Sequence, residues 1–271
     1  MAAWLVAATG AVLVASSVGF VWGFYQPRHE RWAAVGLGVV WVLATVWLGR
    51  TLGLSQPSLT APAVVGTLAV WMAAAGFPWW SRRPGWAPLA GFAVPVLTLW
   101  WAASQVVAPG LRAAAGRASL WEWAHLALLA AAMTSLLLGA AAAGMYLEHE
   151  RELRQKAPRV FYYRLPPLGD LDRWSYRLTV WGWVSLSGCM VTGGLLTAPA
   201  GVYWVETTGA VGMLAVWLAY LIYVVLRARG WRGHGSSWVA VAAFVALAVD
   251  VVGGGGVSHG VAAAWWQGWY G

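Results

Sequence analysis

The chain has 271 residues, of which 61% are hydrophobic and only 10% are charged, whereas about a quarter of the residues of a soluble domain are charged. This balance excludes an ordinary water-soluble protein. The formal net charge is +8, and in a membrane protein such a basic excess is typical of cytoplasmic loops. The composition therefore predicts a protein of the lipid bilayer, and the positions of the Lys and Arg residues, described below, account for the basic excess without nucleic acid.

Eight apolar stretches have close to the 20 residues that a membrane-spanning helix needs. In chain order they are residues 2–24, 33–49, 61–80, 86–107, 120–147, 176–198, 210–226 and 238–257. The first stretch lacks a basic start and a clear cleavage site, so we expect a retained helix. The polar connection 148–175 contains the run EHERELRQK, which predicts a helix that emerges from the bilayer. The sequence thus predicts an all-α polytopic membrane bundle of eight transmembrane helices, forming a single integral membrane domain over residues 1–271.

The Lys and Arg residues predict the orientation of this bundle. If the connection after the first helix is cytoplasmic, only three of the 17 Lys and Arg residues fall outside, namely Arg50, Arg112 and Arg117. Since cytoplasmic loops carry the excess of Lys and Arg, we expect both ends of the chain to lie outside the cytoplasm. The expected location is the plasma membrane of a prokaryote, crossed several times.

The five histidines divide into two groups on this topology. We expect His29, His149 and His234 to lie solvated or at headgroup level in the basic inner connections. In contrast, His125 lies at the outer end of the fifth stretch and His259 just beyond the eighth, at the same membrane level. Two neutral imidazoles from different helices can supply both axial ligands of haem iron. This pair is the metal-ligand candidate, and a purely structural role for each histidine stays open.

Aromatic and acidic residues near the outer side could complete a site. The chain has 23 tryptophans, and those near the outer side, including Trp121, Trp123 and Trp204, could offer a flat surface to a planar ligand, although interfacial anchoring explains many of them. Glu206 lies in an outer loop and Asp250 inside the eighth stretch. An acid at that depth faces the bundle interior, either as a pocket wall or in an interhelical hydrogen bond.

The sequence carries no recognisable catalytic signature. Cys189 is the only cysteine, so an intrachain disulfide, a CxxC pair and a thioether-linked haem are excluded, and we expect this residue to serve packing. The glycine run 253–256 is followed by no GK[ST], and no HExxH occurs. We therefore expect a chaperone or transporter for haem more readily than a stand-alone enzyme.

Several stretches in order resemble a known family. They are HLALLAAAMTSLLLGAAAAGMYLEHERELRQK, LPPLGDLDRWSYRLTVWGWVSLSGCMVTGG, VYWVETTGAVGMLAVWLAYLIYVVLRARGWRG, SSWVAVAAFVAL and VSHG. Residues 119–260, which contain them, resemble the cytochrome c assembly superfamily of haem-handling membrane proteins, which includes the CcsA, CcmC and HemX groups. Residues 1–118 resemble its HemX-like and CcsA-like members more weakly, and residues 261–271 form an aromatic tail.

The resemblance implies a site on the outer side. In the family, two histidines flank a tryptophan-rich external loop and hold haem; by position they correspond to His125 and His259, with Tyr203, Trp204 and Glu206 in the loop. Two features depart from the family. This loop reads YWVETTG instead of a WxWDPKETW-type sequence, and Ala44 stands where many relatives have a histidine in the second helix. The chain is similar to a divergent, HemX-like member.

The function expected from the resemblance is haem trafficking or cytochrome c maturation, with haem b bound non-covalently on the outer side. His125 and His259 would be the axial ligands. The residues expected to contact the porphyrin or its propionates are Trp121, Trp123, Tyr203, Trp204, Glu206, Asp250, Arg50, Arg112 and Arg117. The expected partners are a CcsB-like membrane protein and apocytochrome c.

Two other functions stay open. HemX-like relatives are associated with control of tetrapyrrole synthesis, so the chain could be a regulatory or scaffolding protein that acts through its cytoplasmic loop 148–175. A small-molecule transporter that uses Asp250 is the third alternative, although the acids and histidines form no path across the bilayer.

Overall fold

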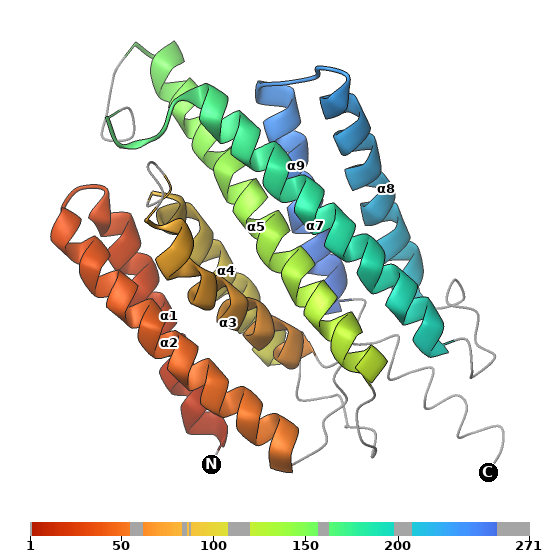
Figure 1. Cartoon of the computed structure of the whole chain (residues 1–271). Coiled ribbons are helices and arrows are strands. Elements are labelled where there is room, and N and C mark those ends of the chain that lie inside the picture. Colours follow the sequence, from red (N-terminus) through yellow and green to blue (C-terminus); the bar gives the residue numbers. More distant parts are fainter. Residues whose placement is uncertain are drawn as a thin grey trace.

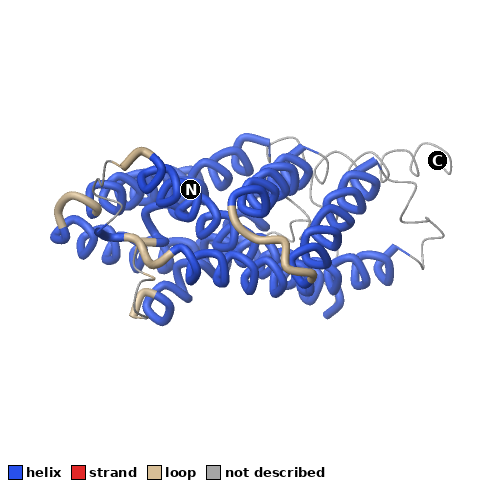
Figure 2. The backbone as a smooth tube through the Cα atoms, turned by 90° about the horizontal axis from the view of Figure 1, so that it is seen from above, coloured by secondary structure: helices blue, strands red, loops and turns tan. Residues whose placement is uncertain are grey.

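The computed structural model describes residues 2–54, 62–82, 86, 88–107, 120–156, 163–197 and 208–253. These ranges contain helices and loops and no strand (Figure 2), which confirms the all-α prediction. The helices in chain order are α1 (Ala2–Gly23), α2 (Pro27–Leu54), α3 (Pro62–Trp80), α4 (Leu89–Val107), α5 (Leu120–Arg154), α7 (Leu168–Thr197), α8 (Thr208–Ala228) and α9 (His234–Gly253).

Seven of these helices are long and apolar enough to cross a membrane. The exception is α3, whose described apolar part is Ala63–Trp79, or about 25 Å at 1.5 Å per residue, against a hydrocarbon core of about 30 Å. The structure thus shows a multi-span membrane protein, as predicted.

Three helices extend by six or more residues beyond one end of the apolar stretches that predicted them. α2 begins at Pro27 instead of residue 33, α5 runs on to Arg154, and α7 begins at Leu168 instead of residue 176. Hydropathy detects only the apolar part of a helix, which lies in the lipid. The helical backbone hydrogen bonding continues through the polar residues beyond it, which lie in water. The helical EHERELR run at the end of α5 was predicted and is confirmed.

The helices alternate in direction, so that α1 begins and α9 ends at the same end of the bundle (Figure 1). We call this the lower end, as it is drawn in Figure 1, and the opposite one the upper end. α1 packs on α2 and α4, while α5 lies in the middle and contacts α3, α4, α7 and α9. The most extensive interface joins α5 and α7.

Glycines allow the backbones of α5 and α7 to approach closely. A Cβ atom on Gly139 of α5 would lie 3.3 Å from the backbone oxygen of Ser175 and 3.3 Å from the backbone nitrogen of Thr179. On α7, a Cβ atom on Gly182 would collide with the side chain of Leu136. Small residues at such contacts are the usual basis of helix association in membranes, so α5 and α7 form a tightly packed pair.

Candidate functional site

His125 lies in the interface of α5 and α7, five residues after the start of α5 and therefore near the lower end. Its ring Nδ1 is 2.9 Å from the backbone oxygen of Cys189 and 3.2 Å from Oγ1 of Thr192, both on α7. A carbonyl oxygen can only accept a hydrogen bond, so Nδ1 carries the ring hydrogen and donates it. In the neutral imidazole the lone pair then belongs to Nε2, which is the nitrogen that can ligate a metal ion.

Cys189 and Thr192 of α7 form the surroundings of this ring. Cys189 is buried, as expected for a packing residue, and its Sγ lies 3.6 Å from Nδ1 and 3.9 Å from Nε2 of His125. The hydroxyl of Thr192 donates to backbone oxygens of its own helix, at 3.0 Å from those of Gly188 and Cys189. That donation directs the hydroxyl hydrogen into the helix and leaves its lone pairs to accept from Nδ1.

Neither Thr192 nor the backbone oxygen of Cys189 was predicted from the sequence as a partner of His125. A usable signal was present, because residues 189 and 192 are three apart and so share one face of α7. The pairing of that face with His125 across 64 positions of sequence depends on the packing of two helices, which a single sequence does not reveal.

Two other predicted residues of α5 lie beside His125 in sequence. Trp121 is four residues earlier and therefore on the same face of the helix, one turn closer to the lower end, with 56% of its surface exposed. Trp123 lies in α5, but its side chain is outside the described part of the chain. The exposure of Trp121 leaves its ring accessible to a ligand or to lipid.

Asp250 and Arg50 also lie toward the lower end, on other helices. Asp250 is partly buried near the end of α9 and packs against Gly212 of α8, where there is no room for a Cβ atom. Since α9 packs on α5, Asp250 belongs to the same part of the bundle as His125. Arg50 is exposed near the end of α2, which packs on α1 and α3, so helix packing does not bring it to the interface of α5 and α7.

The remaining predicted site residues lie outside the described residues. They are Arg112, Arg117, Tyr203, Trp204, Glu206 and His259. The pairing of His125 with His259 therefore stays a prediction.

A family model described as Cytochrome C assembly protein matches residues 33–253, about four fifths of the chain. The chain belongs to the cytochrome c assembly protein family. This confirms the resemblance and extends it over α2, α3 and α4, which the sequence analysis matched only weakly. The match includes His125 and Asp250 and ends before His259. No curated protein and no solved structure matches the chain.

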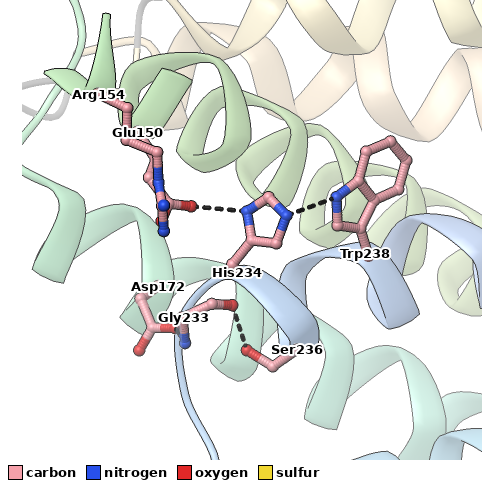
Figure 3. A network of polar contacts seen from close by, with 7 residues as sticks. All are labelled: Glu150, Arg154, Asp172, Gly233, His234, Ser236 and Trp238. Atoms are coloured by element: carbon pink, nitrogen blue, oxygen red, sulfur yellow. Dashed lines mark hydrogen bonds and ion pairs between the residues drawn. The ribbon is translucent and has the colours of Figure 1, made fainter. Parts of the chain in front are cut away.

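The upper end of this cytochrome c assembly protein carries a second polar arrangement (Figure 3). Nδ1 of His234, the first residue of α9, is 2.8 Å from Oε2 of Glu150 on α5, and Nε1 of Trp238 donates to Nε2 of His234 at 3.1 Å. Arg154 binds the other oxygen of Glu150 at 2.7 Å. Because Nε1–H of Trp238 can only donate, Nε2 of His234 accepts, and Nδ1 carries the ring hydrogen that it donates to Glu150. This network joins α5 to α9.

His149, which was expected to lie solvated or at headgroup level, is not solvated in the structure. Only 7% of its surface is exposed, and its Nδ1 lies 3.1 Å from the backbone oxygen of Pro166. Pro166, in the connection that leads into α7, thus contacts the ring through its backbone oxygen. His234 is exposed, as expected, but it forms the specific contacts described above.

A buried ion pair joins α7 to α8 at the same end. Arg227 of α8, with 4% of its side chain exposed, binds both carboxylate oxygens of Asp172 on α7 at 2.8 and 3.0 Å. Arg227 also lies over the ring of Tyr176 at 5.2 Å and donates to the backbone oxygen of Trp231 at 3.3 Å. Gly233, with φ of 88°, turns the chain so that its N–H points at Asp172. This cluster fixes α7, α8 and the turn into α9.

Proposed function

We propose that this cytochrome c assembly protein binds haem b non-covalently as its cargo at the lower end of the bundle, for haem trafficking in cytochrome c maturation. The observation that carries the proposal is the hydrogen bond from Nδ1 of His125 to the backbone oxygen of Cys189. Histidines that ligate metals usually donate their other ring N–H to a carbonyl or carboxylate group, which fixes the tautomer and the ring orientation. His125 already has this arrangement.

The donor set fits haem better than a bare metal ion. No group of three or more His, Cys, Asp or Glu side chains in the described ranges could hold a metal ion, whereas haem iron takes four ligands from the porphyrin and needs only axial ligands from the protein. In the proposal His125 supplies one axial ligand and His259 the other. The exposed ring of Trp121 offers the planar contact that a porphyrin favours.

The other predicted residues complete the proposal. Trp123, Tyr203 and Trp204 pack against the porphyrin, and Glu206 and Asp250 line the site. The propionates are met by Arg112 or Arg117, because arginine pairs well with carboxylates, whereas helix packing does not bring Arg50 to this interface. The protein's share in maturation is to bind and orient haem for a CcsB-like membrane partner and apocytochrome c, without being a stand-alone enzyme.

The proposed topology has eight transmembrane helices, α3 included, with both chain ends outside the cytoplasm of a prokaryotic cell. Among the described Lys and Arg residues, only Arg50 belongs to the lower end of the bundle. The positive-inside rule then assigns the upper end to the cytoplasm and the lower end, with His125, to the outside.

The test is the absorption spectrum of the purified protein. Expressed with ample haem and purified in detergent, the chain should show a low-spin Soret band, which weakens in His125→Ala and in His259→Ala. His29→Ala, a histidine at the opposite end, is the matched control and should keep the band. His125→Gly supplemented with imidazole should regain low-spin ligation, which separates loss of a ligand from loss of folding.

Two results would contradict the proposal. A folded wild-type protein that takes up no added haemin would refute haem binding and favour the regulatory alternative. If His125→Ala keeps the full low-spin band, His125 is not a ligand, whatever the fate of His259→Ala.

A further inference from the structure

A cavity of about 460 Å³ opens at the upper end between α5, α7, α8 and the turn that leads into α9. This size is within the range of about 300–1,000 Å³ that is usual for small-ligand sites. Its lining includes Arg173, Arg227, Arg232, Asp172, Tyr146 and Tyr176. All six of these side chains carry a charge or a hydroxyl group, so the cavity differs from the apolar surface that a membrane helix usually presents to lipid.

The charge of the cavity is positive. Three arginines and one carboxylate line it, which gives a formal charge of +2. The carboxylate of Asp172 is bound by the guanidinium of Arg227. It therefore does little to neutralise the charges of Arg173 and Arg232. Arg173 is weakly paired with the exposed Asp170 at 3.4 Å, and counting that residue still leaves +1. The cavity therefore favours an anion.

The backbone adds to this preference. Leu168 and Gly169, the first two residues of α7, belong to the cavity lining. The N–H groups of a first helical turn and the positive end of the helix dipole both attract anions. The start of α7 and the arginine side chains thus act in the same direction.

The exposed tryptophans nearby indicate the depth of the cavity in the membrane. Trp231 directly precedes the cavity residue Arg232, and Trp238 lies in the second turn of α9; they are 36% and 56% exposed. Tryptophan is enriched at the level of lipid headgroups. The cavity opening then lies where phosphate groups of the adjacent leaflet are concentrated.

We propose that this cavity binds a phosphate group, presented by an anionic phospholipid of the adjacent leaflet or as free phosphate, with Arg173 and Arg232 as its direct contacts. Basic pockets between transmembrane helices are known as a general means of binding lipid headgroups. Arg227 holds the wall of the cavity in place through Asp172, and its side chain is used for that contact. The site is separate from the proposed haem site, because the two lie at opposite ends of the bundle (Figure 1).

The test measures lipid binding to the full-length protein in detergent by native mass spectrometry. The probes are phosphatidylglycerol and phosphatidylcholine with the same acyl chains, and inorganic phosphate as competitor. The cavity variant is Arg173→Gln/Arg232→Gln. The matched control is Arg151→Gln/Arg154→Gln, which removes two exposed arginines at the same end, neither of which lines the cavity.

We expect the wild type to prefer phosphatidylglycerol and the cavity variant to bind it roughly 30-fold more weakly, because each arginine near an anionic lipid contributes roughly fivefold. The control should bind within about threefold of the wild type. If inorganic phosphate binds and displaces the lipid, free phosphate is a ligand; if it does not, the lipid is the source.

Three results would overturn the proposal. They are equal binding of the two lipids, a cavity variant that binds like the wild type, and a control that loses as much affinity as the cavity variant. Circular dichroism of each variant shows whether the helices are retained, and because Arg173 and Arg232 are exposed, we expect the fold to be unchanged.

Discussion

The substitution Asp172→Asn tests how strongly the ion pair at the upper end stabilises the bundle. Asp172 presents two oxygens to Arg227 at 2.8 and 3.0 Å, and the two side chains are only 16% and 4% exposed. Asparagine has the same shape but no charge and only one accepting oxygen. One N–H of Arg227 would then face an amide NH₂, and its charge would remain buried without a counter-ion.

The expected loss in the free energy of unfolding is about 3 kcal/mol, since removing one partner of a buried ion pair costs about 3–5 kcal/mol. The lower value applies because Arg227 keeps the ring of Tyr176 and the backbone oxygens of Asp172 and Trp231. For a chain of this size such a loss corresponds to roughly 6–10 °C in Tm.

The assay is thermal unfolding of the purified protein in one detergent, followed by circular dichroism. A double variant, Asp172→Asn/Arg227→Met, removes both charges and should be less destabilised than the sum of the two single variants by about 2 kcal/mol or more. The reasoning is refuted if Asp172→Asn changes Tm by less than about 2 °C, or if the effects of the single variants simply add.

Three further predictions concern the packing of α7. Thr192→Val removes a hydroxyl that accepts a hydrogen bond from Nδ1 of His125. If haem binds as proposed, the affinity of the protein for haem should fall about tenfold; haemin titration measures this, with Thr192→Ser as the control. Gly182→Ala, in collision with Leu136, should lower the free energy of unfolding by about 1–3 kcal/mol, whereas Gly194→Ala, where nothing lies within 4 Å of the new Cβ atom, should not. Ser187→Ala removes the 2.8 Å acceptor of Nε1 of Trp217 on α8 and should cost about 0.6–1 kcal/mol in the same unfolding assay; no change would mean that this bond adds nothing in lipid or detergent.

Hydropathy predicted the existence of all eight helices, because a run of about 20 apolar residues is a strong signal in a chain that is mostly in lipid. It predicted the helix ends less well where the helix continues beyond the apolar stretch through polar residues. At the start of α7, Asp170 and Arg173 form an exposed pair three residues apart, and such pairs stabilise helices without contributing hydropathy. The apolar window therefore began eight residues after the helix does.

The sequence alone identified His125 as a candidate ligand, but it did not identify the groups that accept a hydrogen bond from its ring. Its selection rested on topology and on the family resemblance, both of which concern order along the chain. The ring orientation depends on a backbone oxygen, that of Cys189, and every residue has a backbone oxygen. The same applies to His149, whose partner is the backbone oxygen of Pro166, and no pattern of side chains could have distinguished that histidine from a solvated one.

The two proposals in this protein can fail independently, and the structure gives the reason. α5 carries His125 near the lower end and the cavity residue Tyr146 near the upper end, 21 residues apart, which is about 32 Å along the helix. Coupling over that distance requires an element with two discrete arrangements, but α5 is held against α7 by direct backbone approach at Gly139 and Gly182. We therefore expect this pair of helices to move as one body. Substitutions of the cavity arginines should accordingly leave the Soret band unchanged, and substitution of His125 should leave the preference for phosphatidylglycerol unchanged.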